Sequence, residues 1–157
     1  MFGAVYDSPL GPLYMVSDGE HLLGLWMKPP ATECVPAGQL EVFQKANHWL
    51  DQYFLGNPLS IDTLPLSPSG TAFQMQVWEI LKTIPYGKTI SYGEIAKRIS
   101  PTMSAQAVGQ AVGKNPLSII IPCHRVVGTS GRMTGYAWGI EKKQWLLAHE
   151  ANGCKER

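Results

Sequence analysis

The first 27 residues alternate short hydrophobic runs with turn signals. Runs at Phe2–Asp7, Leu13–Ser17 and Leu22–Met27 have the length and residue types of short strands. The pair Asp18-Gly19 lies between the second and third runs and favours a tight turn. This pattern predicts an antiparallel meander of three strands.

A helical period follows the predicted strands, between Gln39 and Leu55. The residues near one helical face are Leu40, Phe43, Asn47, Leu50 and Phe54. Gly56 and then Pro58 are residues that commonly end a helix. We therefore expect one helix to pack on the small sheet.

The segment from Pro58 to Gly70 differs from its neighbours because it contains three prolines and has no helical period. We interpret it as the connection between two domains. The predicted boundary separates an N-terminal α/β domain, residues 1–66, from a C-terminal domain, residues 67–157.

The C-terminal domain begins with a helical pattern. Thr71 and Gln74 fit a capping box at its start, and Pro85-Tyr86-Gly87 stops it. The hydrophobic residues at helical spacing are Phe73, Val77, Ile80, Leu81 and Ile84. The sequence therefore predicts a helix over this segment.

Two shorter helices are expected next. Ser91 and Glu94 repeat the capping signal for a helix that Ser100-Pro101 ends, and a third helix should run from about Thr102 to Lys114. Two short helices divided by a tight break are typical of a helix-turn-helix. The predicted fold class is α/β: a small N-terminal antiparallel sheet plus helix, then a mostly helical C-terminal domain with a helix-turn-helix.

The third predicted helix has a slim surface with one polar stripe. Its small residues are Ala105, Ala107, Gly109, Ala111 and Gly113, and its stripe consists of Gln106, Gln110 and Lys114. A slim helix with amide and ammonium groups can approach the groove or backbone of a nucleic acid. Alternatively, the small residues permit close helix packing and the stripe is a solvated face.

The formal net charge of +1 conceals an uneven distribution. Residues 1–69 contain two basic and seven acidic residues, a net charge of −5, whereas residues 70–157 contain 11 basic and five acidic residues, a net charge of +6. This asymmetry favours a second half that faces a polyanion, although a charged surface without a partner remains the alternative.

Composition and cysteine usage indicate a compact protein of the cytoplasm. No apolar run approaches the roughly 20 residues that cross a bilayer, and the N-terminus lacks a signal pattern. The three cysteines, Cys34, Cys123 and Cys154, are odd in number and widely spaced, which argues against a disulfide framework and favours a reducing compartment. His21, Cys34 and His48 lack the paired spacing of a zinc site, so we expect no structural metal.

Candidate chemistry centres on Cys123. The apolar run Leu117–Ile121 predicts a strand that presents Pro122-Cys123-His124-Arg125 on a stiff segment. Positive charge from His124 and Arg125 would favour the thiolate, His124 is a candidate base, and Glu150 is a candidate orienting carboxylate. A buried structural cysteine and a helix-end glutamate are the alternatives.

An ordered series of motifs surrounds this cysteine. Pro122-Cys123-His124-Arg125-Val126 follows Asn115-Pro116 and precedes Gly135-Tyr136 and the hexapeptide Trp-Leu-Leu-Ala-His-Glu at 145–150. Further motifs are Ile90–Ala96, Ala107-Val108-Gly109, Asp7–Gly11 and Ser17–Gly19. Over nearly the whole chain this series resembles the O(6)-alkylguanine-DNA alkyltransferase family, also called methylated-DNA-protein-cysteine methyltransferase.

The resemblance implies a DNA-repair protein that binds duplex DNA, flips out an alkylated guanine, and moves the alkyl group from O(6) to its own cysteine once. O(4)-alkylthymine is a further expected substrate. Cys123 would be the acceptor, His124 would take its proton through a water, and Glu150 would orient His124. Tyr92 would rotate the nucleotide's phosphate and help to protonate the leaving guanine, and Asn115 would hold the region before the cysteine.

The resemblance also implies a set of residues that bind double-stranded DNA, and it implies no cofactor. We expect a monomer, because a single flipped base needs no symmetric partner. The expected DNA contacts are Gln106, Ala107, Gly109, Gln110, Lys114 and Arg125. The expected substrate pocket consists of Val126, Tyr136, Ala137 and Trp138.

Two positions depart from the family pattern. Gln106 stands where the family usually has an arginine that fills the space of the flipped base, which predicts weaker DNA affinity or less efficient flipping. Trp138 stands in a loop that more often has small residues. Two other functions stay open: a non-catalytic alkyltransferase-like DNA-binding protein, and a Cys-His-Glu hydrolase.

Overall fold

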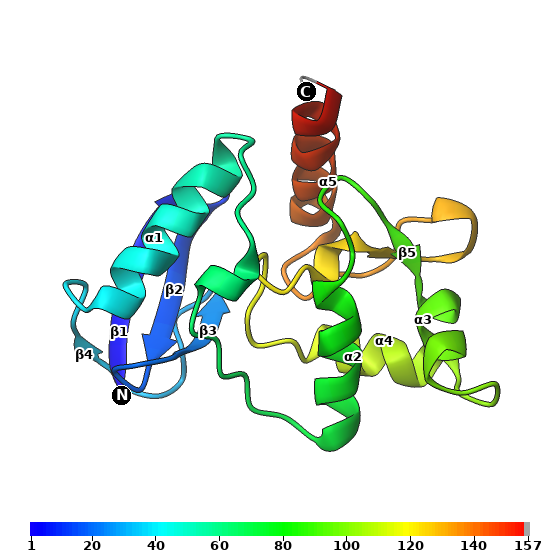
Figure 1. Ribbon diagram of the computed structural model, residues 1–157, viewed down its shortest axis with the longest axis horizontal. Helices are drawn as coiled ribbons and strands as arrows, with labels where there is room; N and C mark the ends of the chain where they lie inside the picture. The colour runs from blue at the N-terminus through cyan, green and yellow to red at the C-terminus, as the bar shows by residue number, and fades with distance from the viewer. Residues whose placement is uncertain (156–157) are drawn as a thin grey trace. The chain divides into compact units, whose positions relative to one another are not determined.

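The computed structural model describes residues 1–155, with side chains through Gly153. Contacts along the chain divide it into two compact units (Figure 1). The first unit consists of residues 1–69 and 116–118, and the second consists of residues 70–115 and those from 119 onward.

A mixed four-stranded sheet forms the centre of the first unit. β1 (Phe2–Ser8), β2 (Gly11–Ser17) and β3 (Leu22–Trp26) pair as the predicted antiparallel meander, with Val5 opposite Tyr14 and Met15 opposite Leu25. The meander is therefore confirmed.

The sheet has a fourth strand that the sequence analysis did not predict. β4 (Val35–Pro36) pairs in parallel with β1, which makes the strand order β3-β2-β1-β4 and the sheet mixed rather than antiparallel. The strand has two residues, and one of them is a proline that lacks a backbone N–H, so it lies at the sheet edge. Such a short proline-containing segment has no alternating pattern to detect.

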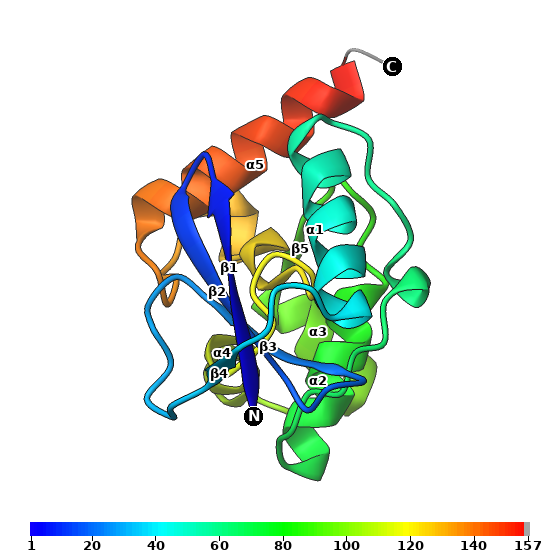
Figure 2. The same cartoon turned by 90° about the vertical axis from the view of Figure 1, so that its left-hand side faces the viewer.

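Helix α1 (Glu41–Phe54) packs along the sheet, as the helical period predicted (Figures 1 and 2). Its buried residues are Val42, Phe43, Ala46, Trp49, Leu50 and Tyr53. The Trp49 indole donates a hydrogen bond to the carbonyl of Leu59 (3.1 Å), which ties the following loop to the helix. A 3₁₀ turn, η1 (Ile61–Thr63), interrupts that loop.

The predicted strand at Leu117–Ile121 is wrong. Only Leu117 forms a bridge, with Leu25, and residues 118–120 form a turn in which Ile119 has a φ of 71°. The run is apolar because Leu117, Ile119 and their neighbours are buried, not because they belong to a ladder. A β-branched residue at positive φ is strained by about 1–3 kcal/mol, so the surrounding packing must hold this turn.

The second unit is mainly helical. Its helices are α2 (Ala72–Lys82), α3 (Tyr92–Ile99), α4 (Ala105–Gly113) and α5 (Ile140–Lys155), with short 3₁₀ turns η2 (Cys123–Arg125) and η3 (Thr129–Gly131). Two short parallel strands, β5 (Ile90–Ser91) and β6 (Val126–Val127), pair between them. The predicted α/β class with a helical second half is confirmed.

Local capping explains where these helices begin. Thr71 and Gln74 form the predicted capping box, and the Ser91 hydroxyl accepts from the Glu94 backbone N–H (3.1 Å). The third helix begins at Ala105 rather than Thr102, because Ser104 is its cap and accepts from Ala107 N–H (3.1 Å). Residues 100–104 are therefore the turn between α3 and α4.

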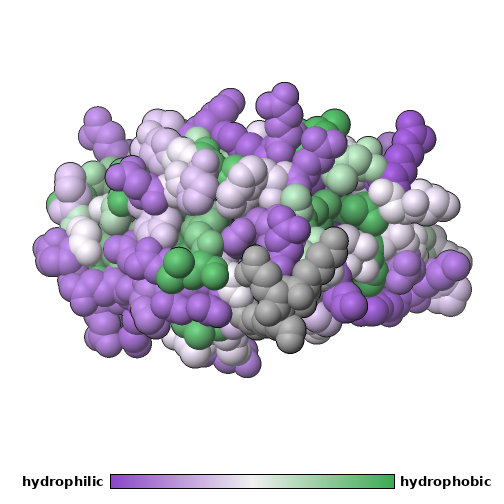
Figure 3. Space-filling model, turned by 90° about the horizontal axis from the view of Figure 1, so that it is seen from above, coloured by the Kyte–Doolittle hydropathy of each residue, from purple (hydrophilic) through white to green (hydrophobic). Residues whose placement is uncertain are grey.

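Hydrophobic side chains on the viewed surface lie in separate small patches among hydrophilic ones (Figure 3). The large hydrophobic residues that are exposed, including Val5, Leu55 and Trp145, are spread over different elements. Within the described part of the chain, no helix is long and apolar enough to span a membrane.

Candidate functional site

Helices α3 and α4 pack as a helix-turn-helix, and α4 keeps one face exposed. Gln106, Gln110 and Lys114 are exposed on it, whereas Val108 and Ala111 are buried. The Trp78 indole of α2 donates to the carbonyl of Ala111 (2.9 Å) and so fixes α4 against α2. Among the small residues of α4, Ala111 is buried in the helix packing, whereas Ala105 and Gly113 are exposed, and the polar stripe is available to a ligand.

Tyr92 begins α3 next to the slim side of α4. A Cβ placed on Gly109 would lie 3.7 Å from two Tyr92 ring carbons, and both residues are half-buried, as is Ala107. The predicted catalytic tyrosine and the predicted DNA-binding helix are therefore adjacent within this unit.

Asn115 connects the end of α4 with the cysteine segment. Its Nδ2 donates to the carbonyl of Ile121 (2.8 Å), and its side chain also bonds to Cys123. Cys123 is the first residue of η2 and has only 6% of its surface exposed. A buried asparagine in this position holds the turn that carries the cysteine.

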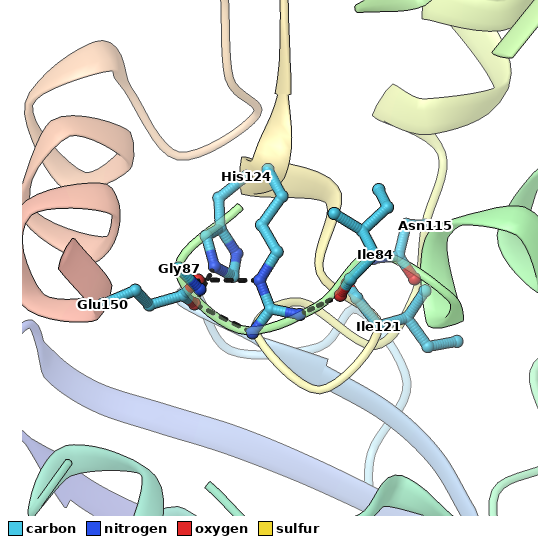
Figure 4. A network of polar contacts seen from close by, with 7 residues as sticks. Ile84, Gly87, Asn115, Ile121, His124 and Glu150 are labelled. Atoms are coloured by element: carbon cyan, nitrogen blue, oxygen red, sulfur yellow. Dashed lines mark hydrogen bonds and ion pairs between the residues drawn. The ribbon is translucent and has the colours of Figure 1, made fainter. Parts of the chain in front are cut away.

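Glu150 of α5 joins three groups from other elements (Figure 4). It lies against the His124 ring, with His124 Nε2 2.5 Å from Glu150 Oε2, and Glu150 Oε1 accepts from the backbone N–H of Gly87 (3.1 Å). Arg125 donates through Nε to Oε1 (2.7 Å) and through Nη2 to Oε2 (3.1 Å). These bonds hold the pKa of Glu150 far below its usual range, although burial alone would raise it.

The carboxylate determines the state of His124. Burial lowers the pKa of His124 more than Glu150 raises it, so the ring is neutral near pH 7. A neutral ring that donates from Nε2 to a carboxylate carries its lone pair on Nδ1. That Nδ1 is buried and has no hydrogen-bond partner among the described residues. His124 can therefore accept a proton at Nδ1.

The expectation that Arg125 contacts DNA does not fit its position. Arg125 is buried, its Nε and Nη2 donate to the Glu150 carboxylate, and its Nη1 donates to the carbonyl of Ile84 (2.7 Å). It also lies over the Tyr86 ring at 5.7 Å. These three hydrogen bonds direct the guanidinium into the protein, where it holds Glu150.

The electrostatics at Cys123 also differ from the expectation. Burial raises the pKa of the thiol, and the groups that oppose this rise are the Asn115 and Tyr136 side chains and the charge of Lys143. The charge of Arg125 is compensated by Glu150. The resting cysteine is therefore a thiol that has thiolate-stabilising groups around it.

Lys143 is a residue that the sequence analysis missed. Its side chain has no exposed surface, and burial lowers its pKa. A signal was present, because Lys143, Leu146 and Glu150 have the i, i+3, i+7 spacing of one helical face and all three are fully buried. Two polar residues on the buried face of a helix indicate a functional role.

The remaining predicted residues lie around the same segment. Val126 is fully buried and pairs with Ile90, Tyr136 and Trp138 are half-buried, and Ala137 is exposed. Among the residues that the structure describes, no three His, Cys, Asp or Glu side chains are grouped so as to hold a metal. His21, one of the three residues compared with a zinc site, has its Nδ1 at 3.2 Å from Oδ2 of Asp18.

Two sequence models of one family match consecutive parts of the chain. The model described as "6-O-methylguanine DNA methyltransferase, ribonuclease-like domain" matches residues 1–68, and the one described as "6-O-methylguanine DNA methyltransferase, DNA binding domain" matches residues 72–152.

Relatives are similar over nearly the whole chain. A methylated-DNA-protein-cysteine methyltransferase of Methanosarcina acetivorans is 44% identical over 97% of this chain and 99% of its own length. The crystal structure of Mycobacterium tuberculosis OGT in complex with DNA has a TM-score of 0.90 at 42% identity, covering 98% of this chain and 94% of that chain. A Methanococcus jannaschii O6-methylguanine DNA methyltransferase has a TM-score of 0.71 at 29% identity, with 94% and 93% covered. The chain belongs to the O6-methylguanine-DNA methyltransferase family.

Proposed function

We propose that this protein repairs DNA by transferring a methyl or other alkyl group from O(6) of guanine to Sγ of Cys123, once per molecule. The observation that carries this proposal is the buried Cys123 beside His124, whose Nδ1 is unpartnered among the described residues while Glu150 holds Nε2. That arrangement supplies a nucleophile with an adjacent base and an orienting group.

The transfer exchanges one bond for another. The thiol proton moves to Nδ1 of His124, directly or through a water, and the Sγ–carbon bond forms as the bond from carbon to O(6) breaks. Tyr92 gives its proton to a ring nitrogen of the leaving guanine and regains one from the imidazolium through solvent. A thioether is not hydrolysed under mild conditions, so the protein is consumed.

DNA binding is assigned to the helix-turn-helix. The exposed Gln106, Gln110 and Lys114 of α4 support contacts to duplex DNA, and residues 70–157 carry a net charge of +6. Extruding a base costs a few kcal/mol, which these contacts must offset. We further propose that one copy of the chain acts on one flipped base and that the protein acts in the cytoplasm.

The deciding experiment is incubation with duplex DNA containing O(6)-methylguanine, followed by intact-mass and peptide analysis. One methyl group on Cys123, absent in Cys123→Ser and present in the control Cys34→Ser, supports transfer. Cys34 is a matched control because it is the other free cysteine with a described side chain. Bound DNA with an unmodified Cys123 contradicts transfer and favours a non-catalytic lesion-binding protein, and repeated turnover favours a hydrolase.

A further inference from the structure

A chain of three hydrogen-bonded side chains lies beside the cysteine. Lys143 Nζ of α5 donates to Thr134 Oγ1 (3.1 Å), and Thr134 Oγ1 lies 3.0 Å from the hydroxyl oxygen of Tyr92. Thr134 belongs to the loop before α5, and neither the sequence motifs nor the proposed transfer assigns it a role.

The donor inventory of the side chains fixes the direction of the first of these hydrogen bonds. A lysine ammonium has donors only, so Thr134 Oγ1 must accept from Lys143. Either oxygen of the Thr134–Tyr92 pair can be the donor; with Lys143 donating to Thr134, the Thr134 hydrogen is available to be given to Tyr92. The hydrogen of Tyr92 is then left for a third group.

Lys143 carries charge at a place where charge changes during transfer. Its side chain is fully buried, and no carboxylate within the described residues forms an ion pair with it. It interacts electrostatically with Cys123, and Nζ lies 6.0 Å from the centre of the Tyr92 ring. The charge of Lys143 therefore acts both on Cys123, which receives the alkyl group, and on Tyr92, which gives a proton to the leaving guanine.

We propose that Thr134 is a positioning residue that makes Tyr92 a donor to the departing guanine. In the proposed arrangement Thr134 accepts from Lys143 and donates to Tyr92, which leaves the phenol hydrogen for the substrate. When that hydrogen moves to the guanine ring, the negative phenolate oxygen accepts the Thr134 hydrogen bond, which the Lys143 ammonium polarises. This inference rests on the proposed function, because it concerns the leaving-group proton of that reaction.

The test compares Thr134→Val, which keeps the shape and removes the hydroxyl, with Thr134→Ser, which keeps the hydroxyl. The rate constant for methyl transfer is measured in a single turnover at saturating DNA. Because a positioned general acid contributes roughly 100-fold or more, we expect about 10-fold slower transfer in Thr134→Val and a change of less than about threefold in Thr134→Ser. In a Tyr92→Phe background, Thr134→Val should have no further effect.

Thr83→Val is a matched control. Thr83 also loses a hydroxyl hydrogen bond, to the carbonyl of Ile80 (2.6 Å), but lies at the exposed end of α2. We expect Thr83→Val to transfer at the unmodified rate. Thermal melts of both valine variants show whether either substitution changes folding.

Alkylation of Cys123 by iodoacetamide separates a proton effect from a structural one. Iodide leaves without a proton, so Thr134→Val should react with iodoacetamide about as fast as the unmodified protein.

Equal methyl transfer in Thr134→Val and the unmodified protein overturns the inference, as does equal slowing in Thr134→Val and Thr134→Ser. If the unmodified protein transfers no methyl group, the proposed function itself fails, which is a separate outcome.

Discussion

Replacing Arg125 by methionine should destabilise the fold and leave the protein's contacts to DNA phosphates unchanged. Arg125 donates two hydrogen bonds to the fully buried Glu150 and one to the carbonyl of Ile84. Removing one partner of a buried ion pair costs about 3–5 kcal/mol. We expect the lower end, because Glu150 keeps its hydrogen bonds to Gly87 and His124.

A loss of about 3 kcal/mol is large against a total stability of about 5–15 kcal/mol. It corresponds to a decrease in Tm of about 6–12 °C for a chain of this size. Urea unfolding followed by tryptophan fluorescence measures the loss directly. Duplex DNA binding is measured below the Tm at several salt concentrations.

Lys114→Met is the matched control, because Lys114 is exposed on α4. Its Tm should not change, and its slope of log K against log salt concentration should decrease by about 0.9 if it contacts one phosphate. Arg125→Met should instead have a lower Tm and an unchanged slope of log K against log salt concentration. An Arg125→Met protein with unchanged stability and a shallower salt dependence would refute the assignment of Arg125 to the protein interior.

Three further predictions concern acid stability, thiol reactivity and DNA affinity. Because the pKa of Glu150 lies below the ordinary glutamate value of 4.5, its carboxylate stabilises the fold above pH 4.5, and this stabilisation is lost as the pH falls below 4.5. In urea unfolding, Glu150→Gln should therefore be less stable at pH 7, and its stability should fall less on acidification. Equal loss of stability in acid contradicts this reasoning. Burial raises the pKa of Cys123 above 9.0, so the rate of its alkylation by iodoacetamide should still increase with pH beyond that value. Lys143→Met should shift this pH–rate curve to higher pH. A rate that levels off near neutral pH would contradict the raised pKa. Gln106→Arg should bind duplex DNA more tightly with a steeper salt slope, by about 0.9, and unchanged affinity in a gel shift removes the argument.

Much of the fold was predictable because its signals are local. The strands of the meander follow runs of hydrophobic residues, and the starts of α2 and α3 follow from Thr71 and Ser91, whose hydroxyls cap helices within one turn. Strand β4 and the turn around Ile119 were not predictable. Both depend on a partner or on packing far away in the chain, and a buried turn has the same hydrophobic content as a buried strand.

The candidate site divides in the same way. The sequence by itself determined that Cys123, His124 and Arg125 are adjacent, and the helical spacing before Glu150 contained the signal for Lys143. Only the tertiary structure decided that the two cations serve different groups, with Arg125 bound to Glu150 and Lys143 near Cys123 and Thr134. The physical reason is that charge compensation inside a protein depends on distances between side chains, and Arg125 and Glu150 are 25 residues apart in the chain.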